Sequence, residues 1–439
     1  MKYLAPLALI LAFAAAAPAQ RPNVVLVVTD DQPRSTIQHM PLTKSLLNVN
    51  FTNAYVTTPT CCPSRVGVFT GLYSHNTGVL GNHAPLGGAT AFSDAETLAV
   101  WLQRLGYRTA LMGKYLNEYR LVWWHVPPGW DEWRAWIDPA GTANFNAYHL
   151  NEGGVKRYRT EYVTDYLFRR ADDFIRAAPA DRPFFLYVAP PTPHDPYTPS
   201  AADRGKFSTL PLPKPPNFDE EDVSDKPSWV RKLPRFSAED LARMESDYRS
   251  VVESVQSIDR GVKKLFDALE STGRLDNTVF IFTSDNGMAF GQHRLVGKHC
   301  PYDVCVRVPL LMRAPGVPSG SVGGMVANID LAPTILELAG SEMPLPSDGV
   351  SFVPLLRDPA APGRPSLLLE FLWPGYNSNR LFYAVRKSNY VYVEYLRTGE
   401  RELYNLALDP HQLNNIYGKA GTEKLTSGLQ KTLAALKAQ

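Results

Sequence analysis

The feature of this sequence that most constrains its fold is a set of short apolar runs that lack alternation. Asn23–Thr29 (NVVLVVT) is a continuous β-branched run, which is typical of a strand buried on both faces. Tyr107–Met112, Pro183–Ala189 and Thr278–Thr283 contain three further strands, and segments with helical patterns lie between some of them. Strands that alternate with helices predict an α/β fold, with a large, mainly parallel sheet sandwiched by helices.

Two helices are expected between these strands. Ser93–Glu96 has the pattern of a capping box, and the leucine stripe after it stops at Gly106. A second helix is expected over much of Ala238–Leu269. Residues 201–236 are rich in proline and charge, and we expect them to form a long excursion on the surface.

The character of the sequence changes from about Ser366. Short strands in hairpin spacing follow, and this spacing is typical of an antiparallel sheet. The last helix carries Leu425, Leu429, Leu433 and Leu436 on one stripe, which would cover one face of that sheet. We therefore expect a large α/β domain over residues 20–360 and a small C-terminal antiparallel α+β subdomain over residues 361–439.

The first residues have the pattern of a secretory signal. Lys2 precedes an apolar run, Leu4–Ala17, and Ala17 and Ala19 have the spacing of a cleavage site. The run is shorter than the roughly 20 residues of a membrane-spanning helix, and no later stretch is long and apolar enough to span a bilayer. Residues 1–19 are therefore predicted to be a cleaved signal peptide. The mature chain would be secreted, periplasmic or lysosomal, depending on the host.

Charge and cysteine content exclude several classes of protein. The chain has 45 Lys+Arg and 43 Asp+Glu, a formal net charge of +2, so a diffuse basic surface for nucleic acid is not expected. Its 4 cysteines are too few for a disulfide scaffold. Cys300 and Cys305 could pair with each other, but sequence does not fix the connectivity. Cys61 and Cys62 are adjacent and need another explanation.

Distinctive polar residues follow four of the predicted strands, and they are Asp30, Asp31, Lys114, His194, Asp285 and Asn286. Each one alone has an ordinary explanation as a turn, cap or loop residue. In open α/β sheets, however, ligands bind beyond the carboxyl ends of the strands. Three carboxylates and an amide oxygen form the oxygen set that Ca²⁺ or Mg²⁺ prefers. The sequence lacks the His and Cys cluster of a zinc site.

The strongest motif is Cys61–Gly71 (CCPSRVGVFTG). It resembles the sulfatase signature, Cys-x-Pro-x-Arg followed by four residues and Thr-Gly, and every fixed position matches. Gly106–Lys114 resembles the second signature of that family. Shorter matches are Pro193–Pro196, Thr283–Gly287, Gly297–Lys298, Tyr302 and Arg307–Pro309. The chain therefore resembles the formylglycine-dependent sulfatases of the alkaline-phosphatase-like superfamily from about residue 22 to residue 330, and more weakly to residue 410.

The resemblance implies a mechanism. A formylglycine-generating enzyme would oxidise Cys61 to formylglycine (3-oxoalanine), and one oxygen of its hydrate would attack the sulfur of a sulfate ester. The second hydrate oxygen would then expel sulfate, which an unmodified cysteine could not do. The same resemblance implies that a divalent cation, Ca²⁺ first and Mg²⁺ second, binds to Asp30, Asp31, Asp285, Asn286 and the modified Cys61.

The remaining site candidates are cationic or titratable, and they are Arg65, Lys114, His194, His293 and Lys298. Arg65 lies one helical turn after Cys61 and would hold the hydrate. Lys114 and Lys298 would clamp the sulfate, and either Lys298 or His194 would protonate the leaving oxygen. His293 would also contact substrate, although it could equally be an ordinary loop histidine. Many sulfatases have a histidine where this chain has Leu116, so base duties assigned to that histidine fall to another group here.

Two stretches point to a substrate. Gly113–Tyr119 and His125–Trp133 resemble the glucosamine-6-sulfatase branch, which includes extracellular heparan 6-O-endosulfatases and lysosomal N-acetylglucosamine-6-sulfatase. This resemblance implies 6-O-sulfated glucosamine of glycosaminoglycans as substrate. The nearby tryptophans would either stack on sugar rings or pack as an aromatic core. Because the chain lacks the long basic insert of the endosulfatases, exo action or a small substrate is favoured.

Three alternatives remain open at this point. The chain could be a generic arylsulfatase acting on aryl sulfate esters, or a phosphatase or phosphodiesterase of the same superfamily. Cys61 in a modification motif and the lack of paired histidine ligands oppose the second alternative. The third is an inactive, exported glycan-binding relative. Retention of all the candidate site residues opposes it, because a binding protein would not need them all.

Overall fold

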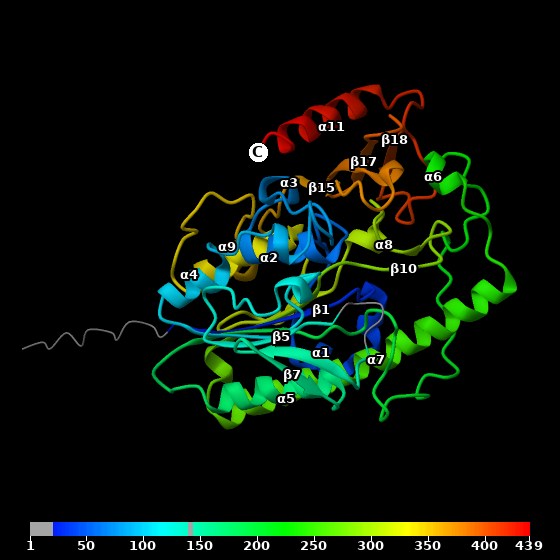
Figure 1. The fold of residues 1–439 in the computed structure, drawn as a ribbon. Helices are drawn as coiled ribbons and strands as arrows, with labels where there is room; N and C mark the ends of the chain where they lie inside the picture. The colour runs from blue at the N-terminus through cyan, green and yellow to red at the C-terminus, as the bar shows by residue number, and fades with distance from the viewer. Residues whose placement is uncertain (1–20, 139–143) are drawn as a thin grey trace, which may run out of the picture.

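The structure is a computed structural model that describes residues 21–138 and 144–439. The predicted signal peptide, residues 1–19, lies outside these ranges. Figure 1 shows a large sheet with helices on both sides, and a small sheet with the C-terminal helix above them. Within the described ranges, no helix is both long and apolar enough to cross a bilayer.

The large sheet has ten strands in a mixed arrangement. In spatial order they are β13 (Gly320–Val322), β2 (Val49–Phe51), β12 (Leu310–Arg313), β9 (Thr278–Ser284), β1 (Asn23–Thr29), β8 (Phe184–Ala189), β4 (Arg108–Gly113), β5 (Glu132–Trp136), β6 (Tyr148–Glu152) and β7 (Val155–Arg159). The five central strands from β9 to β5 are parallel to one another, whereas β12, β6 and β7 run antiparallel to their neighbours. The predicted large, mainly parallel sheet is confirmed.

Alternate residues of β1 enter two different cores. Val24, Leu26 and Val28 pack in the core that includes α2 (Cys61–Thr70), α4 (Leu98–Arg104) and α9 (Leu331–Leu338). Val25 and Val27 pack in the core that includes α5 (Val163–Arg176) and α7 (Ala238–Ser271). The absence of alternation in the sequence of this strand therefore follows from burial on both faces, and Figure 1 shows the two helical layers.

The remaining elements are short. The helices are α1 (Pro41–Leu46), α3 (Ser74–Thr77), α6 (Ser228–Arg231), α8 (Asp303–Val306), α10 (Val353–Arg357) and the longer α11 (Glu423–Leu436). The 3₁₀ turns are η1 (Arg34–His39), η2 (Ala89–Ala91), η3 (Tyr119–Val122), η4 (Leu275–Asn277), η5 (Asn328–Asp330) and η6 (Ser378–Arg380). Two small sheets pair β10 (Ala289–Phe290) with β11 (Val296–Gly297), and β3 (Ala54–Tyr55) with β14 (Val326–Ala327).

Two sequence predictions need correction. The helix expected to open at the Ser93–Glu96 capping box begins at Leu98, because the Glu96 carboxylate bonds forward to Arg104 and to Trp101 Nε1 (2.7 Å). The excursion 201–236 is not confined to the surface. Its Trp229 is buried in a core shared with the C-terminal sheet. The long helix covers the expected range Ala238–Leu269 and continues to Ser271.

The C-terminal sheet has the predicted antiparallel form. It consists of β15 (Leu367–Phe371), β16 (Phe382–Arg386), β17 (Tyr390–Tyr395) and β18 (Arg401–Asn405). Leu429, Leu433 and Leu436 of α11 are buried against it, and Leu425 is partly buried. The same core contains Cys300, Tyr302 and Cys305, so this sheet packs on a segment that follows β9.

A buried ion pair beside α9 carries the first testable prediction. Both oxygens of Asp330 accept hydrogen bonds from Arg364, and they also accept from the backbone N–H groups of Ala327 and Val350, each at 2.8 Å. Asp330→Ala should lower the free energy of unfolding by about 3–5 kcal/mol, because it leaves the buried Arg364 guanidinium without its carboxylate partner and with only the Asp348 carbonyl as acceptor. Urea unfolding measures this loss. Asp276→Ala is the control and should leave the midpoint nearly unchanged, because the Asp276 side chain is fully exposed beside Arg313.

Candidate active site

The site is built at the carboxyl ends of the central strands. Asp30 follows β1, Lys114 follows β4, and the Asp285–Asn286 pair follows β9. His194 lies five residues beyond the end of β8. Because β9, β1, β8 and β4 are adjacent and parallel, these side chains converge at one edge of the sheet.

Asp31 is turned toward the same point by an uncommon backbone conformation. Its φ is 57°, in the left-handed region that non-glycine residues rarely adopt, and its N–H donates to Asp285 Oδ1 at 3.0 Å. Asn286 Nδ2 donates to Asp31 Oδ1 at 2.7 Å. The carboxylates that follow β1 and β9 are therefore held together as one cluster.

Cys61 is the first residue of α2 and points into this cluster. Its Sγ lies 3.5 Å from Asp30 Oδ1 and 3.5 Å from Asp31 Oδ1. Lys298 Nζ is 2.8 Å from the same sulfur and also contacts Asp31 Oδ1. Cys61 is fully buried, and every other residue of α2 is buried as well. The predicted nucleophile position therefore lies between two carboxylates and a cation.

Arg65 lies one turn further along α2 and joins several parts of the cluster. Its Nε donates to Asp285 Oδ2 at 2.8 Å, and its Nη1 donates to the Lys114 carbonyl at 3.2 Å. Its Nη2 is buried, has no hydrogen-bond partner in the described chain, and lies 3.9 Å from Asp30 Oδ1. Arg65 is thus a fully buried cation that links Asp285 to the region of Cys61.

Lys114 and His194 complete the cationic side of the cluster. Lys114 Nζ lies 2.6 Å from Asp30 Oδ2. His194 Nε2 lies 3.4 Å from Asp31 Oδ2, and its Nδ1 lies 2.6 Å from Asp195 Oδ1. The structure therefore brings together Asp30, Asp31, Cys61, Arg65, Lys114, His194, Asp285, Asn286 and Lys298, as the sequence predicted.

The electrostatic environment holds the site in defined charge states. Burial favours protonation of Asp31, but the charges of Lys298 and His194 outweigh it and lower the pKa of Asp31 to about 2. Burial opposes the charge on His194, yet Asp31 and Asp30 raise the pKa of His194 to about 9. Burial also raises the pKa of the Cys61 thiol well above its usual value, despite the nearby lysines. The unmodified thiol is therefore protonated, which makes it a poor nucleophile.

The donor set suits a hard divalent cation. Ligand atoms of Asp30, Asp31, Cys61 and His194 lie within 4.8 Å of one another. The Oδ1 atom of Asn286 is buried and has no hydrogen-bond partner among the described residues. A buried amide oxygen without a partner costs free energy unless a ligand or ion satisfies it. Carboxylates and an unpaired amide oxygen together fit Ca²⁺ or Mg²⁺.

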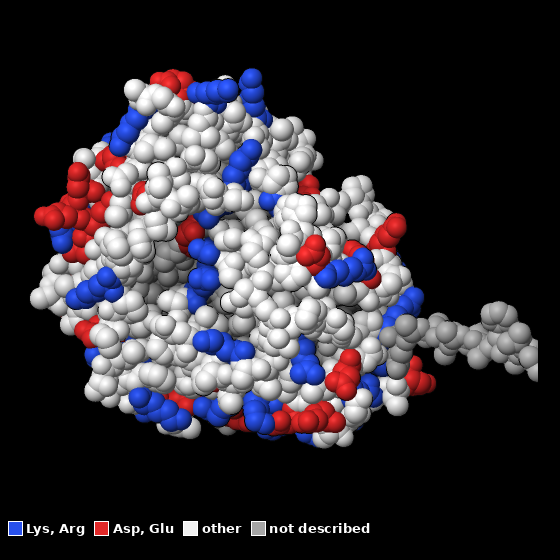
Figure 2. Space-filling model, turned by 180° about the vertical axis from the view of Figure 1, so that it is seen from behind, with Lys and Arg blue, Asp and Glu red and all other residues white. Residues whose placement is uncertain are grey.

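A cavity of about 260 Å³ opens beside the cluster. Its lining residues are Asp30, Asn82, His83, Lys114, Leu116, Asn117, Glu118, Tyr119, Arg120, Trp136, Ile137, Asp138, Phe145, Pro191, His194 and Asp195. This volume is slightly below the roughly 300–1,000 Å³ of typical ligand pockets, so the cavity suits a small ligand. Figure 2 shows one face of the molecule, on which basic and acidic side chains are interspersed and the surface is hollowed.

The predicted tryptophan cluster is divided between core and surface. Trp133 is buried in the core above the sheet, and Trp130 packs against that core. Trp136 lines the cavity, whereas Trp124 is 61% exposed. The packed-core explanation therefore holds for Trp130 and Trp133, and also for Trp136, which is buried in the core that includes Phe145 and Tyr148 although it borders the cavity.

His293 is not brought into the cluster. It is fully buried, its Nδ1 lies 2.6 Å from Glu220 Oε2, and its Nε2 accepts from Asn217 Nδ2 at 3.1 Å. Its ring also packs on the ring of Tyr302, with 4.2 Å between the two ring centroids. In this arrangement His293 joins the excursion 201–236 to the segment after β9, and it presents no surface to a substrate.

Several residues that line the cavity were not singled out from the sequence. His83 Nδ1 lies 2.9 Å from Glu118 Oε1, and both residues line the cavity. Asn82 Oδ1 accepts from the Cys62 N–H at 3.0 Å and so contacts the start of α2. The sequence signal for Glu118 was present in the Gly113–Tyr119 stretch, but nothing in the pattern pairs it with His83.

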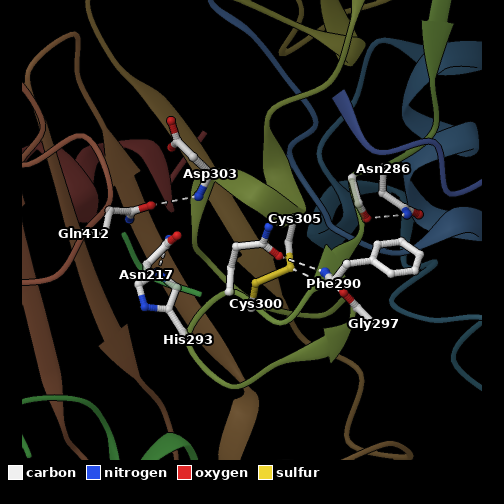
Figure 3. Close-up of a disulfide and its surroundings, with 11 residues drawn as sticks. Asn217, Asn286, Phe290, His293, Gly297, Cys300, Asp303, Cys305 and Gln412 are labelled. Carbon is white, nitrogen blue, oxygen red and sulfur yellow. Dashed lines mark hydrogen bonds between the residues drawn. A yellow bond between two sulfur atoms is a disulfide. The ribbon is translucent and has the colours of Figure 1, made fainter. Parts of the chain in front are cut away.

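The disulfide between Cys300 and Cys305 supports the segment that carries Lys298. The pairing left open by the sequence is formed, with a Cα–Cα distance of 5.8 Å. The Cys305 carbonyl accepts from the Gly287 N–H at 2.9 Å, next to Asn286. Figure 3 shows the disulfide between Gly297 and Asp303, with Asn286 close by. The disulfide thus closes the loop that follows Lys298, and the backbone hydrogen bond from Gly287 joins that loop to the segment that carries Asn286.

The chain has an alkaline-phosphatase-like α/β fold, with the site at the carboxyl ends of its central strands. A solved structure described as a complex with its substrate D-glucosamine-2-N,6-O-disulfate is similar, with a TM-score of 0.82 and 24% identity over 95% of this chain and 98% of that chain. The family model described as Sulfatase matches residues 22–341, and the one described as N-sulphoglucosamine sulphohydrolase, C-terminal, matches residues 291–439. The chain belongs to the sulfatase family and is a sulfuric ester hydrolase.

Two relatives indicate where in the family the chain lies. The N-acetylglucosamine-6-sulfatase of Capra hircus is 33% identical over 92% of this chain and 81% of that protein. The extracellular sulfatase SULF-1 homolog of Drosophila melanogaster is 33% identical over 77% of this chain. The match covers 31% of the length of the fly protein. The predicted resemblance to the glucosamine-6-sulfatase branch is confirmed.

Proposed function

We propose that this chain is an exported sulfatase that hydrolyses 6-O-sulfate esters of glucosamine in glycosaminoglycans, after Cys61 is converted to formylglycine. The observation that carries the proposal is the position of Cys61, with Sγ 2.8 Å from Lys298 Nζ and 3.5 Å from two carboxylates. The names of the goat and fly relatives and the substrate of the similar structure support the substrate class.

The proposed roles follow from the contacts. Lys114 lines the cavity and would neutralise the sulfuryl oxygens, while Lys298 contacts the nucleophile position. His194 lines the cavity and its pKa is raised to about 9, so at neutral pH it is charged and would donate a proton to the leaving oxygen. Arg65 would hold the modified side chain on α2. A bound divalent cation would polarise the sulfate as a Lewis acid, held by Asp30, Asp31, Asp285, Asn286 and the modified Cys61.

The proposal also covers export, domain organisation, maturation and location. Residues 1–19 would be removed on export, and residues 20–360 would form the catalytic domain. Residues 361–439 would form the C-terminal subdomain. A formylglycine-generating enzyme would act on Cys61, and its thiol's raised pKa supports the need for that modification. The location would be extracellular, periplasmic or lysosomal, depending on the host.

Sulfate release from small sulfated sugars tests the proposed function. We expect release from N-acetylglucosamine-6-sulfate with kcat/KM at least about tenfold above that for galactose-6-sulfate, because a site that bonds one sugar discriminates against others. Ion chromatography measures the sulfate released. Fast turnover of aryl sulfates with no release from either sugar would favour the generic arylsulfatase instead.

Metal removal provides an independent test. Treatment with EDTA followed by desalting should abolish turnover and lower the melting temperature, because ion binding stabilises only the folded state. Adding Ca²⁺ should restore both, and Mg²⁺ should restore less. Full activity in protein shown by elemental analysis to be metal-free would contradict the proposed cation site.

A further inference from the structure

A second cavity, of about 290 Å³, shares no lining residue with the first. It lies where five separate segments meet: the residues after Asp31, the excursion 201–236, helix α7 at Tyr248, the stretch from Met288 to Arg307, and the C-terminal subdomain near Gln412. Its polar lining residues are Arg34, Ser35, Asn217, Tyr248, Gln292, Asp303, Arg307, His411 and Gln412. None of them belongs to the cluster around Cys61.

Positive charge in this cavity exceeds negative charge. No described residue forms a hydrogen bond or ion pair with the Arg34 guanidinium, and burial together with nearby Arg307 lowers the pKa of Arg34. Asp303 is engaged elsewhere, since its Oδ1 contacts Arg386 and its Oδ2 lies 3.6 Å from Arg307 Nη1. The single carboxylate of Asp303 is therefore shared among three arginines, and Arg34 forms no ion pair with it.

Gln412 adds a buried donor to the same cavity. Its Oε1 accepts from the Asp303 N–H at 2.9 Å, which fixes the orientation of the carboxamide. The residue is only 2% exposed, and its buried Nε2 has no hydrogen-bond partner in the described chain. Figure 3 shows Gln412 bonded to Asp303, with Asn217 on the same side. An unpaired buried donor is costly, so it indicates a ligand that accepts hydrogen bonds.

Asn217 offers a complementary acceptor. Its Nδ2 donates to the His411 carbonyl at 3.1 Å and to His293 Nε2 at 3.1 Å. Its Oδ1 is therefore the free atom, and it is buried without a partner among the described residues. Asn217 Oδ1 is thus an acceptor in the cavity that also contains the Arg34 and Gln412 donors. This combination suits a ligand that carries a hydroxyl group next to an anionic group.

We infer that this cavity binds an oxyanion, a sulfate or carboxylate group, through Arg34 and Gln412 Nε2. The planar guanidinium matches two oxygens of such a group, and Arg307 adds a second positive charge. The oxyanion has two candidate sources, which are free inorganic sulfate and an anionic group on a sulfated glycan whose hydroxyl would reach Asn217 Oδ1. The inference does not depend on the reaction proposed at Cys61.

Calorimetric titration of the whole chain with sodium sulfate, at ionic strength held constant with sodium chloride, tests the inference. Lys298→Ala serves as the parent, because it weakens sulfate binding at the catalytic cluster. We expect saturable binding to the parent and at least about tenfold weaker binding to Arg34→Met, which loses the charged hydrogen bonds. Arg34→Lys should bind with intermediate affinity, because it keeps the positive charge but loses the planar contact with two oxygens. Arg204→Met is the control, because Arg204 is exposed on the excursion and does not line the cavity.

Gln412→Glu is a second, independent variant, which keeps the inference testable if Arg34→Met fails to fold. It keeps the acceptor for the Asp303 N–H but places a negative charge at the cavity, so it should abolish sulfate binding. Repeating each titration with a sulfated, uronate-containing disaccharide distinguishes the two sources. A loss seen only with the disaccharide assigns the cavity to glycan, and a loss seen only with sulfate assigns it to the free ion. Parent affinity in Arg34→Met and Gln412→Glu for both ligands, or no saturable binding to the parent, would overturn the inference.

Discussion

Cys61→Ala is expected to lower sulfate release at least about a thousandfold while leaving the fold intact, because it removes the side chain that becomes the nucleophile. No other described group is positioned to replace it, since both carboxylates beside Cys61 are engaged by lysines. Alanine removes only the sulfur atom and is a good helix former at the start of α2, so the melting temperature should change little. Initial rates of sulfate release and a thermal melt measure the two effects.

Cys62→Ala is the matched control for this variant. Cys62 is equally buried, and it packs in the core above the sheet rather than pointing at Asp30 and Asp31. This variant should keep turnover within about threefold of wild type and lose only packing energy. Mass spectrometry of the tryptic peptide Ser45–Arg65 would show an aldehyde at Cys61 in active native protein. Near-normal turnover of Cys61→Ala, or two intact thiols in active protein, would contradict the formylglycine mechanism.

Asp285→Asn is expected to reduce turnover at least about a hundredfold and to lower the content of bound divalent metal. The substitution preserves the shape of the side chain but removes its negative charge. That charge faces Arg65 Nε at 2.8 Å, and the other carboxylate oxygen accepts from the Asp31 N–H at 3.0 Å. Turnover under saturating substrate and metal per chain by elemental analysis measure the two losses.

Asp259→Asn separates this effect from the general loss of a buried carboxylate. Asp259 is 3% exposed and accepts from the backbone N–H groups of Leu42 and Thr43 at the start of α1, away from the catalytic cluster. The Asp259→Asn variant should be less stable than wild type, but its kcat and metal content should stay near those of wild type. If Asp285→Asn kept both turnover and metal, Asp285 would have no place in the proposed site.

The sequence predicted the parts of the site that depend on strands and on the helix α2. The apolar runs end at polar residues, and parallel strands bring their carboxyl ends to one edge, so Asp30, Lys114 and Asp285 could be placed together before the structure was known. Arg65 followed from helical spacing, because residues four apart lie on one face.

The sequence did not predict contacts that depend on long loops. His293 is held by Glu220, 73 residues earlier in the excursion, and no periodicity reports such a pairing. The helix α4 begins two residues after Glu96 because that side chain bonds to Arg104 instead of to the backbone at the helix start. The start of α4 depends on whether Glu96 bonds to the backbone at the helix start or to Arg104. Local sequence preference cannot decide between these two bonds, so it misplaced the start of the helix by a few residues.

The burial of Cys61 sets an order of events in the life of the protein. A side chain with no exposed surface, at the start of a helix packed on all sides, cannot enter the active site of another enzyme once the chain has folded. The proposed oxidation must therefore be finished on the nascent or unfolded chain. A molecule that folds first keeps its thiol permanently, and no later exposure to the modifying enzyme repairs it. In a preparation, the active fraction would then report how the rate of folding compared with the rate of modification.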